Sequence, residues 1–275
     1  MVSRYVAERY PQSVPNHTGG RPSRGRQPPD RSRSYSNQEP RQYPIPAGRF
    51  RGRQATAGWT DRPTWAACER PGVVPEAPAE FYSRTAERFA VRNDRESLPE
   101  PFVAFIDRFL DHVDGDRIVD VGCGTGRETG HFVRQGYEAI GVDVAAGMID
   151  HASATEPGDY CRMDAAGLGI ADDAADAVWC NAVLVCFEPA AMGEVVDELV
   201  RVLAPGGVVQ IGLKLGSGEF VRETDRRSVR QHLIGEDRAR RLLTDRGVDV
   251  VHDAVFDPRP EAPYRFYDVI GRLGG

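Results

Sequence analysis

A glycine-rich loop between a short apolar segment and a helical segment is the feature that most constrains this chain. Residues 118–129 read IVDVGCGTGRET, so an apolar strand leads into the loop Gly122-Cys123-Gly124-Thr125-Gly126 and a helix begins directly afterwards. Glycines allow the backbone to turn sharply and to bring a ligand close to the free N–H groups of a helix N-terminus. The pattern therefore predicts a strand–loop–helix unit that binds a nucleotide-like ligand.

The acidic residue at the end of the next apolar segment narrows the choice of ligand. Asp143 stands 21 residues after Gly122, a position from which a carboxylate reaches the hydroxyls of a ribose. The loop reads G-x-G-x-G, and Arg127 occupies the place of the last small residue of a dinucleotide G-x-G-x-x-G site. Asp120 is awkward beside a pyrophosphate but suits a cation such as the sulfonium and amine of S-adenosylmethionine. No Gly-Lys-Ser/Thr follows, which excludes a Walker loop.

Short apolar segments alternate with amphipathic ones through the rest of the chain. The spacing predicts helices over 80–92, 101–112, 126–135, 145–154, 189–203 and 237–246, and strands over 117–121, 139–142, 160–163, 177–180, 208–213, 248–256 and 264–270. Such alternation predicts an α/β fold, a doubly wound Rossmann-like seven-stranded sheet that is mostly parallel and carries helices on both faces. Only residues 257–262 join the last two strands, too few for a helical crossover, so the last strand should be antiparallel.

The first 72 residues differ in composition from the rest of the chain. They hold 13 arginines, no lysine, five acidic residues and ten of the 20 prolines, a formal charge of +8, whereas the remainder carries −14. A segment so poor in aliphatic residues cannot bury enough apolar surface to offset the entropy of ordering. We therefore predict a disordered Arg/Pro-rich tail over 1–72 and one domain over 73–275. A solvated tail, translated upstream sequence and a nucleic-acid docking arm all remain open for the tail.

The sequence disfavours a membrane protein, a metal-binding protein and a disulfide-bonded protein. No run approaches about 18 apolar residues, and the first ten residues lack the apolar core of a secretory signal. The five cysteines form no CxxC pair and the histidines have no partners at metal spacing, so we expect no metal and a cytoplasmic protein with reduced thiols. Lys214 is the only lysine among 35 basic residues, which, with the acidic domain, fits a halophilic cytoplasm or a GC-rich genome.

Several motifs together resemble the class I S-adenosylmethionine-dependent methyltransferase family over residues 74–275. VDVGCGTG (Val119–Gly126) is similar to the family's first motif, and GVDVAAGMI (Gly141–Ile149) to its ribose-binding motif. LAPGGVVQIGLK (Leu203–Lys214) resembles the turn into the fifth strand. LKLGSGE and the closing RFYDVIGR resemble a subgroup that methylates small molecules.

The resemblance also implies a cofactor and a set of residues around it. RMDAAGLGIADDAADAVWCNAVL (Arg162–Leu184) resembles the adenine-proximal region, in which Asp164 matches the acid that contacts the adenine amino group. FYSRTAERFA (Phe81–Ala90) resembles the N-terminal helix whose tyrosine closes over the cofactor. The implied cofactor is S-adenosylmethionine, and the expected binding residues are Tyr82, Asp120, Gly122, Cys123, Gly124, Thr125, Gly126, Asp143, Val144, Met148, Met163, Asp164, Ala165 and Asn181.

Two departures from the family pattern leave the methyl acceptor open. Residues 181–184 read NAVL, so the Asn-Pro-Pro-Tyr motif that grips a planar amine in DNA or glutamine methylation is missing. Cys186 stands where many relatives have a histidine, which removes one candidate general base. Asn181, Lys214 and Glu219 follow the fourth and fifth strands, so they should face the ligand edge and are the remaining catalytic candidates.

Three functions are compatible with these features. The first is a methyltransferase that acts on a small molecule. The second is an RNA or protein methyltransferase that docks through the basic tail, although the acidic domain would repel phosphate and disfavours nucleic acid. The third is a non-catalytic cofactor-binding protein of the same fold. Nothing in the sequence sets the oligomeric state.

Overall fold

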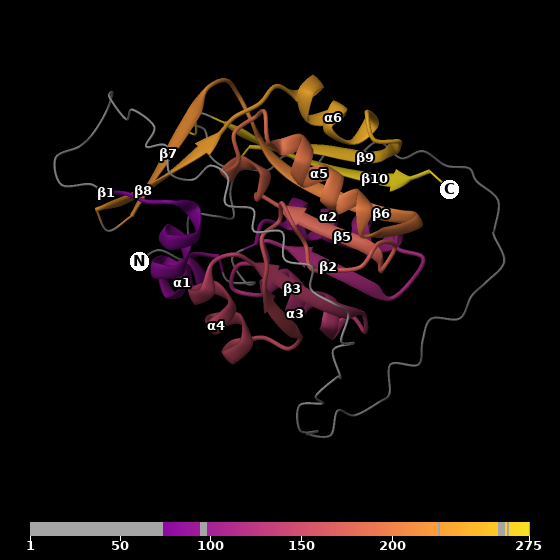
Figure 1. Ribbon diagram of the computed structural model, residues 1–275, viewed down its shortest axis with the longest axis horizontal. Coiled ribbons are helices and arrows are strands. Elements are labelled where there is room, and N and C mark those ends of the chain that lie inside the picture. Colours follow the sequence, from indigo (N-terminus) through magenta and orange to yellow (C-terminus); the bar gives the residue numbers. More distant parts are fainter. Residues whose placement is uncertain (1–73, 94–97, 225, 258–261, 263, 275) are drawn as a thin grey trace. The chain divides into compact units, whose positions relative to one another are not determined.

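The computed structural model describes residues 74–93, 98–224, 226–257, 262 and 264–274, which include all the helices and strands of Figure 1. The tail predicted over 1–72 lies outside the described residues, so its disorder and the domain boundary at 73 stay predictions. No helix among the described residues is long and apolar enough to cross a membrane.

A seven-stranded sheet forms the centre of the described domain. Its order is β4 (Asp159–Arg162), β3 (Glu138–Asp143), β2 (Arg117–Val121), β5 (Ala175–Asn181), β6 (Leu203–Leu215), β10 (Arg265–Leu273) and β9 (Val248–Phe256). The pairs from β4 to β6 are parallel, and β10 runs antiparallel to both β6 and β9. The predicted α/β fold, with a mostly parallel sheet and an antiparallel last strand, is confirmed.

Helices cover both faces of this sheet (Figure 1). They are α1 (Pro78–Arg92), α2 (Glu100–Asp111), α3 (Arg127–Arg134), α4 (Ala146–Thr155), α5 (Met192–Arg201) and α6 (Glu236–Thr244), with a 3-10 turn η2 (Leu184–Cys186) before α5. Because side chains alternate along a strand, Val178 and Cys180 pack with α5 and α6, whereas Trp179 faces α2 and α3. The Trp179 ring centroid lies 5.0 Å from that of Phe109 and 5.8 Å from that of Phe132.

A second, three-stranded sheet was not expected from the sequence. It consists of β1 (Val74–Pro75), β8 (Arg227–His232) and β7 (Glu219–Thr224), with β1 parallel to β8 and β7 antiparallel to it. Glu76 reinforces the junction, since its backbone N–H donates to the Ser228 carbonyl at 2.9 Å and its carboxylate pairs with Arg227 and Arg84. The hairpin adjoins the carboxyl end of β6, and α1 follows β1 directly (Figure 1).

Polar composition explains why this hairpin was missed. Side chains of β7 alternate between exposed and partly exposed, and the buried positions of β8 include Ser228, Gln231 and His232. Neither strand therefore carries the apolar run or the apolar–polar alternation that marks a strand. The fifth strand also starts earlier than predicted, at Leu203, because Pro205-Gly206-Gly207 lies inside an irregular strand rather than before it.

Candidate functional site

The glycine loop lies at the carboxyl end of β2 and leads into α3. Gly122, Gly124 and Gly126 have φ angles of 70°, 54° and 82°, in the left-handed region where a residue with a Cβ atom is strained. The N–H groups of Gly122 and Cys123 donate to the Val142 carbonyl at 2.7 and 3.0 Å, which ties the loop to β3. The sequence thus positions the loop through backbone conformations that glycine readily adopts.

Asp143 connects the end of β3 to this loop. Its Oδ2 accepts from the Gly124 N–H at 3.0 Å, and its Oδ1 accepts from the Ala145 N–H at 2.8 Å. Burial raises the pKa of Asp143, and the bonds from the backbone oppose that rise. Because a carboxylate can accept about four hydrogen bonds, Asp143 retains acceptor capacity for the two hydroxyls of a ribose.

Asp120 lies beneath the loop and contacts α3. It is 2% exposed, and its Oδ2 accepts from the Thr129 hydroxyl at 2.5 Å. Burial, with a smaller effect of Glu128, raises the pKa of Asp120 well above its usual range. A cation bound nearby would favour the carboxylate again. A role opposite a cationic group stays a prediction.

The other predicted cofactor residues gather along the same carboxyl edge. Met148 of α4 is buried, whereas Val144 is 36% exposed. The Met163 N–H donates to the Asp143 carbonyl at 3.1 Å. Asp164 is exposed and accepts from the Ala166 N–H at 3.0 Å, in the loop after β4. Cys123, Thr125 and Ala165 are buried, and Asn181 ends β5 half-buried.

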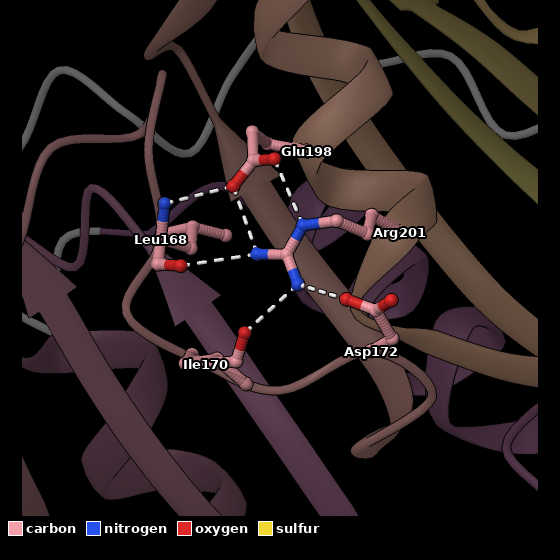
Figure 2. Close-up of polar contacts among 5 residues, drawn as sticks. All are labelled: Leu168, Ile170, Asp172, Glu198 and Arg201. Carbon is pink, nitrogen blue, oxygen red and sulfur yellow. Dashed lines mark hydrogen bonds and ion pairs between the residues drawn. The ribbon is translucent and has the colours of Figure 1, made fainter. Parts of the chain in front are cut away.

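Arg201 anchors the loop that continues from Asp164. In Figure 2 its guanidinium donates to the carbonyls of Leu168 and Ile170 at 3.0 and 2.9 Å, and to the carboxylates of Asp172 and Glu198. Glu198 also accepts from the Leu168 N–H at 2.9 Å, and its bond with Arg201 lowers the pKa of Glu198. One side chain at the end of α5 therefore holds the segment that borders the predicted adenine position.

Replacing Arg201 with methionine should release that segment. We expect the free energy of unfolding to fall by about 1–3 kcal/mol, because two carbonyls and two carboxylates lose their donor. Urea denaturation measures the change. Arg108→Met is a matched control. The Arg108 side chain is 56% exposed and its guanidinium lies 3.9 Å from the Asp111 carboxylate, so this exposed ion pair contributes little to stability. Equal stability of the two variants would show that the Arg201 bonds do not anchor the loop.

Helix α1 covers the glycine loop. A Cβ atom placed on Gly124 would meet only the Phe89 ring, at 3.7 Å, and the Gly147 N–H donates to the Ser83 hydroxyl at 3.2 Å. Tyr82 and Phe89 pack against Met148 of α4. A shallow surface hollow between α1 and β7 is lined partly by Arg92 and Arg222 of these elements and contains none of the predicted cofactor residues.

Tyr82, the predicted cover residue, belongs to a buried polar cluster. The Lys214 ammonium donates to the Gln231 side-chain carbonyl at 2.6 Å, and the Gln231 amide donates to the Tyr82 hydroxyl at 2.9 Å. Burial raises the pKa of Tyr82, and it raises the pKa of the Cys186 thiol to about 11. Sequence reasoning named Lys214 and Tyr82 but missed Gln231, because β8 had not been recognised.

Glu219, the third catalytic candidate, makes its polar contacts with other residues than that cluster. It is exposed on β7, and its carboxylate accepts from Arg230 at 2.7 Å. Together with Glu188 and His232 it forms the one group of the described residues that could hold a metal ion. The two carboxylates approach different ring nitrogens of His232, Glu188 at Nε2 and Glu219 at Nδ1, 3.7 and 4.0 Å away. This arrangement fits an imidazole between two acids better than a shared metal ligand set.

Comparisons with known proteins agree with the fold. Residues 119–211 match the family described as "Methyltransferase domain". The malonyl-[acyl-carrier protein] O-methyltransferase of Yersinia pestis is 34% identical over 34% of this chain and 34% of its own length. The demethylmenaquinone methyltransferase of Clavibacter sepedonicus is 29% identical over 52% of this chain and 58% of its own length. The chain thus spans less than two thirds of the length of the curated relatives it matches.

A solved structure has a similar fold. The 1,6-didemethyltoxoflavin-N1-methyltransferase of Burkholderia thailandensis, determined with 1,6-didemethyltoxoflavin and S-adenosylhomocysteine bound, superposes with a TM-score of 0.55. It is 22% identical and covers 71% of this chain and 86% of its own length. At this identity the likeness is one of fold.

Proposed function

We propose that this chain, whose residues 119–211 belong to the methyltransferase domain family, transfers a methyl group from S-adenosylmethionine to a small-molecule acceptor. The observation that carries the proposal is the glycine loop with Asp143 bonded to its centre, under the cover of α1. A relative named for demethylmenaquinone and a structural neighbour holding 1,6-didemethyltoxoflavin support a small-molecule acceptor, whereas the relative named for malonyl-[acyl-carrier protein] is named for an acyl group borne on a carrier protein.

The residues of the carboxyl edge fit this cofactor. Three glycines in left-handed conformations lead into α3, and of these only Gly124 is half-buried with nothing but the Phe89 ring, at van der Waals distance, near the position of a Cβ atom. Asp143 would accept from the ribose hydroxyls, and Asp164 would accept from the adenine amino group. Tyr82 and Phe89, on α1, would exclude water from the site.

Methyl transfer mainly requires that the acceptor atom be aligned with the methyl group. Bound S-adenosylmethionine supplies a methyl group that already carries a good leaving group. The protein therefore has to hold the acceptor in line with that methyl group, and positioning of this kind can lower the barrier by about 7–11 kcal/mol. A protein base is needed only for an acceptor atom that carries a proton.

Calorimetry with the full-length chain tests the cofactor assignment. We expect S-adenosylhomocysteine to bind and NAD not to bind, because the loop is G-x-G-x-G with Arg127 where a dinucleotide site needs a small residue. Tight binding of NAD without any response to S-adenosylhomocysteine would refute the proposal.

A screen of small molecules with radiolabelled methyl donor tests turnover. Methyl transfer to at least one compound is the expected result. Cofactor binding with no transfer to any small molecule, RNA or protein would favour a non-catalytic binding protein instead.

A further inference from the structure

Lys214 occupies a special place at the ligand edge of the sheet. It is the only lysine of the chain, and it lies next to the carboxyl end of β6, the strand beside β5 and its terminal Asn181. It is only 4% exposed, although lysine is almost never buried without a partner. A side chain so placed calls for a physical explanation.

Aromatic rings and one amide surround the Lys214 nitrogen. The nitrogen lies 5.0 Å from the ring centroid of Phe220, 4.0 Å from that of Tyr264 and 5.6 Å from that of Phe266. Its hydrogen bond goes to the Gln231 side-chain carbonyl at 2.6 Å. Within the described part of the chain, no carboxylate pairs with it. The described surroundings of the nitrogen therefore supply no fixed negative charge.

The groups facing Lys214 bring its two protonation states close in free energy. Burial first, and then the Arg222 cation of β7, lower the pKa of Lys214 to about 7, and only a thiolate at Cys186 of η2 would oppose the shift. The faces of the three rings and the Gln231 carbonyl stabilise the ammonium when it forms. The amine can therefore take up a proton near neutral pH and release it again.

The cluster also adjoins the predicted cofactor site. Gln231 connects Lys214 to Tyr82 on the covering helix. Cys186 lies close enough to Tyr82 for a hydrogen bond and close enough to both Lys214 and Asp143 for their charges to shift the pKa of its thiol. Lys214 is thus hydrogen-bonded through Gln231 to the tyrosine that covers the site, and both its charge and that of the carboxylate expected to hold the ribose act on the Cys186 thiol.

We propose that Lys214 is the general base of methyl transfer, and that the methylated atom of the acceptor carries a proton, as in a phenolic or enolic hydroxyl or an amine, rather than being a carboxylate. The inference rests on the proposed function. With a hydroxyl acceptor, the O–H bond breaks, its proton goes to the Lys214 lone pair, and the bonding electrons stay on the oxygen, which forms the new bond to the methyl carbon. With an amine acceptor, the nitrogen lone pair forms that bond, and an N–H proton of the resulting ammonium then goes to Lys214. In both cases the electrons of the old carbon–sulfur bond stay on sulfur, and the Lys214 ammonium later returns its proton to water.

A single-lysine chain permits a direct measurement of this group. In the full-length protein labelled with ¹⁵N at the lysine side chain, one signal reports Lys214, and its pH titration can be followed with and without S-adenosylhomocysteine. We expect a midpoint near 7, against about 10.4 for an ordinary lysine. A midpoint at or above 10 overturns the proposal. This measurement needs no acceptor, so it is independent of whether the proposed function holds.

Two variants show whether the surroundings set that midpoint. Arg222→Gln removes the neighbouring cation, so the midpoint should rise. Arg240→Gln is the matched control, because Arg240 is exposed and pairs with Asp253 on β9, and it should leave the midpoint unchanged. Equal midpoints in the two variants would contradict the charge balance on which the proposal depends.

Kinetics on acceptors from the screen separate a base from a structural lysine. Lys214→Met should lower kcat at least about 100-fold for a hydroxyl or amine acceptor, while the affinity for S-adenosylhomocysteine stays within about twofold. Lys214→Arg should not restore the rate, because a guanidinium keeps its proton. Full activity of Lys214→Met, or a carboxylate as the acceptor that is turned over, overturns the proposal.

Discussion

Replacing Asp143 with alanine is expected to weaken binding of S-adenosylhomocysteine at least about tenfold. The carboxylate accepts from Gly124 in the loop and from Ala145 at the start of α4, and its remaining acceptor capacity faces the predicted ribose position. Hydrogen bonds to a charged group are worth roughly 1.5–3 kcal/mol each, and about 1.4 kcal/mol is a tenfold change in affinity. Calorimetric titration of the full-length variant measures the loss.

A neighbouring acid provides the control for Asp143. Asp159 begins β4, the strand beside β3, and is exposed, so Asp159→Ala should bind the ligand like the parent protein. Melting curves of both variants ensure that each is folded at the temperature of the titration. If Asp143→Ala binds as tightly as Asp159→Ala, Asp143 does not belong to the site.

A methyl group added at Gly147 should displace the helix that covers the loop. Gly147 lies in α4, and a Cβ atom there would stand 2.2 Å from the backbone carbonyl oxygen of Ser83 in α1. Within α4 the change to alanine is favourable by roughly 0.5–1 kcal/mol, so any harm must come from the contact with α1. We expect faster hydrogen exchange in α1 and faster dissociation of S-adenosylhomocysteine from Gly147→Ala.

Gly193 offers a matched glycine in another helix. A Cβ atom on Gly193 of α5 would meet only the far end of the Arg246 side chain, at 2.7 Å, which can move aside. Gly193→Ala should therefore keep the exchange rates of α1 and the ligand dissociation rate of the parent. Unchanged α1 exchange in Gly147→Ala would mean that α1 is not held against α4 at this point.

The inner strands of the central sheet could be predicted because they are buried on both faces. Segments such as Ala139–Val142 and Ala177–Cys180 read as short apolar runs, and glycine or helical spacing marks where each ends. The strand–loop–helix unit could also be predicted, because the glycines that adopt left-handed conformations form a G-x-G-x-G pattern that is recognisable in the sequence. The hairpin of β7 and β8 gave no such signal, because its side chains are mostly polar whether buried or exposed.

The candidate site, too, could be predicted only in part. Asp143 could be placed at the loop from spacing alone, because strand length fixes where a strand ends. The environment of Lys214 could not, since its neighbours Phe220, Gln231 and Tyr264 come from segments that meet only in three dimensions. Nor could the sequence show that Asp120 points under the loop to Thr129, because that depends on which face of β2 meets α3.

The pairing of β1 with β8 has a consequence for the order of events during synthesis. The segment that leads into α1 emerges from the ribosome early, yet its strand partner, with Arg227 for Glu76, is more than 150 residues further along the chain. The glycine loop and Asp143 can therefore be in place well before β8 has been translated. Contacts between residues so distant in sequence are slow to form. We therefore expect α1 to be fixed over the glycine loop late, and the chain to reach full ligand affinity only after the C-terminal third has been synthesised.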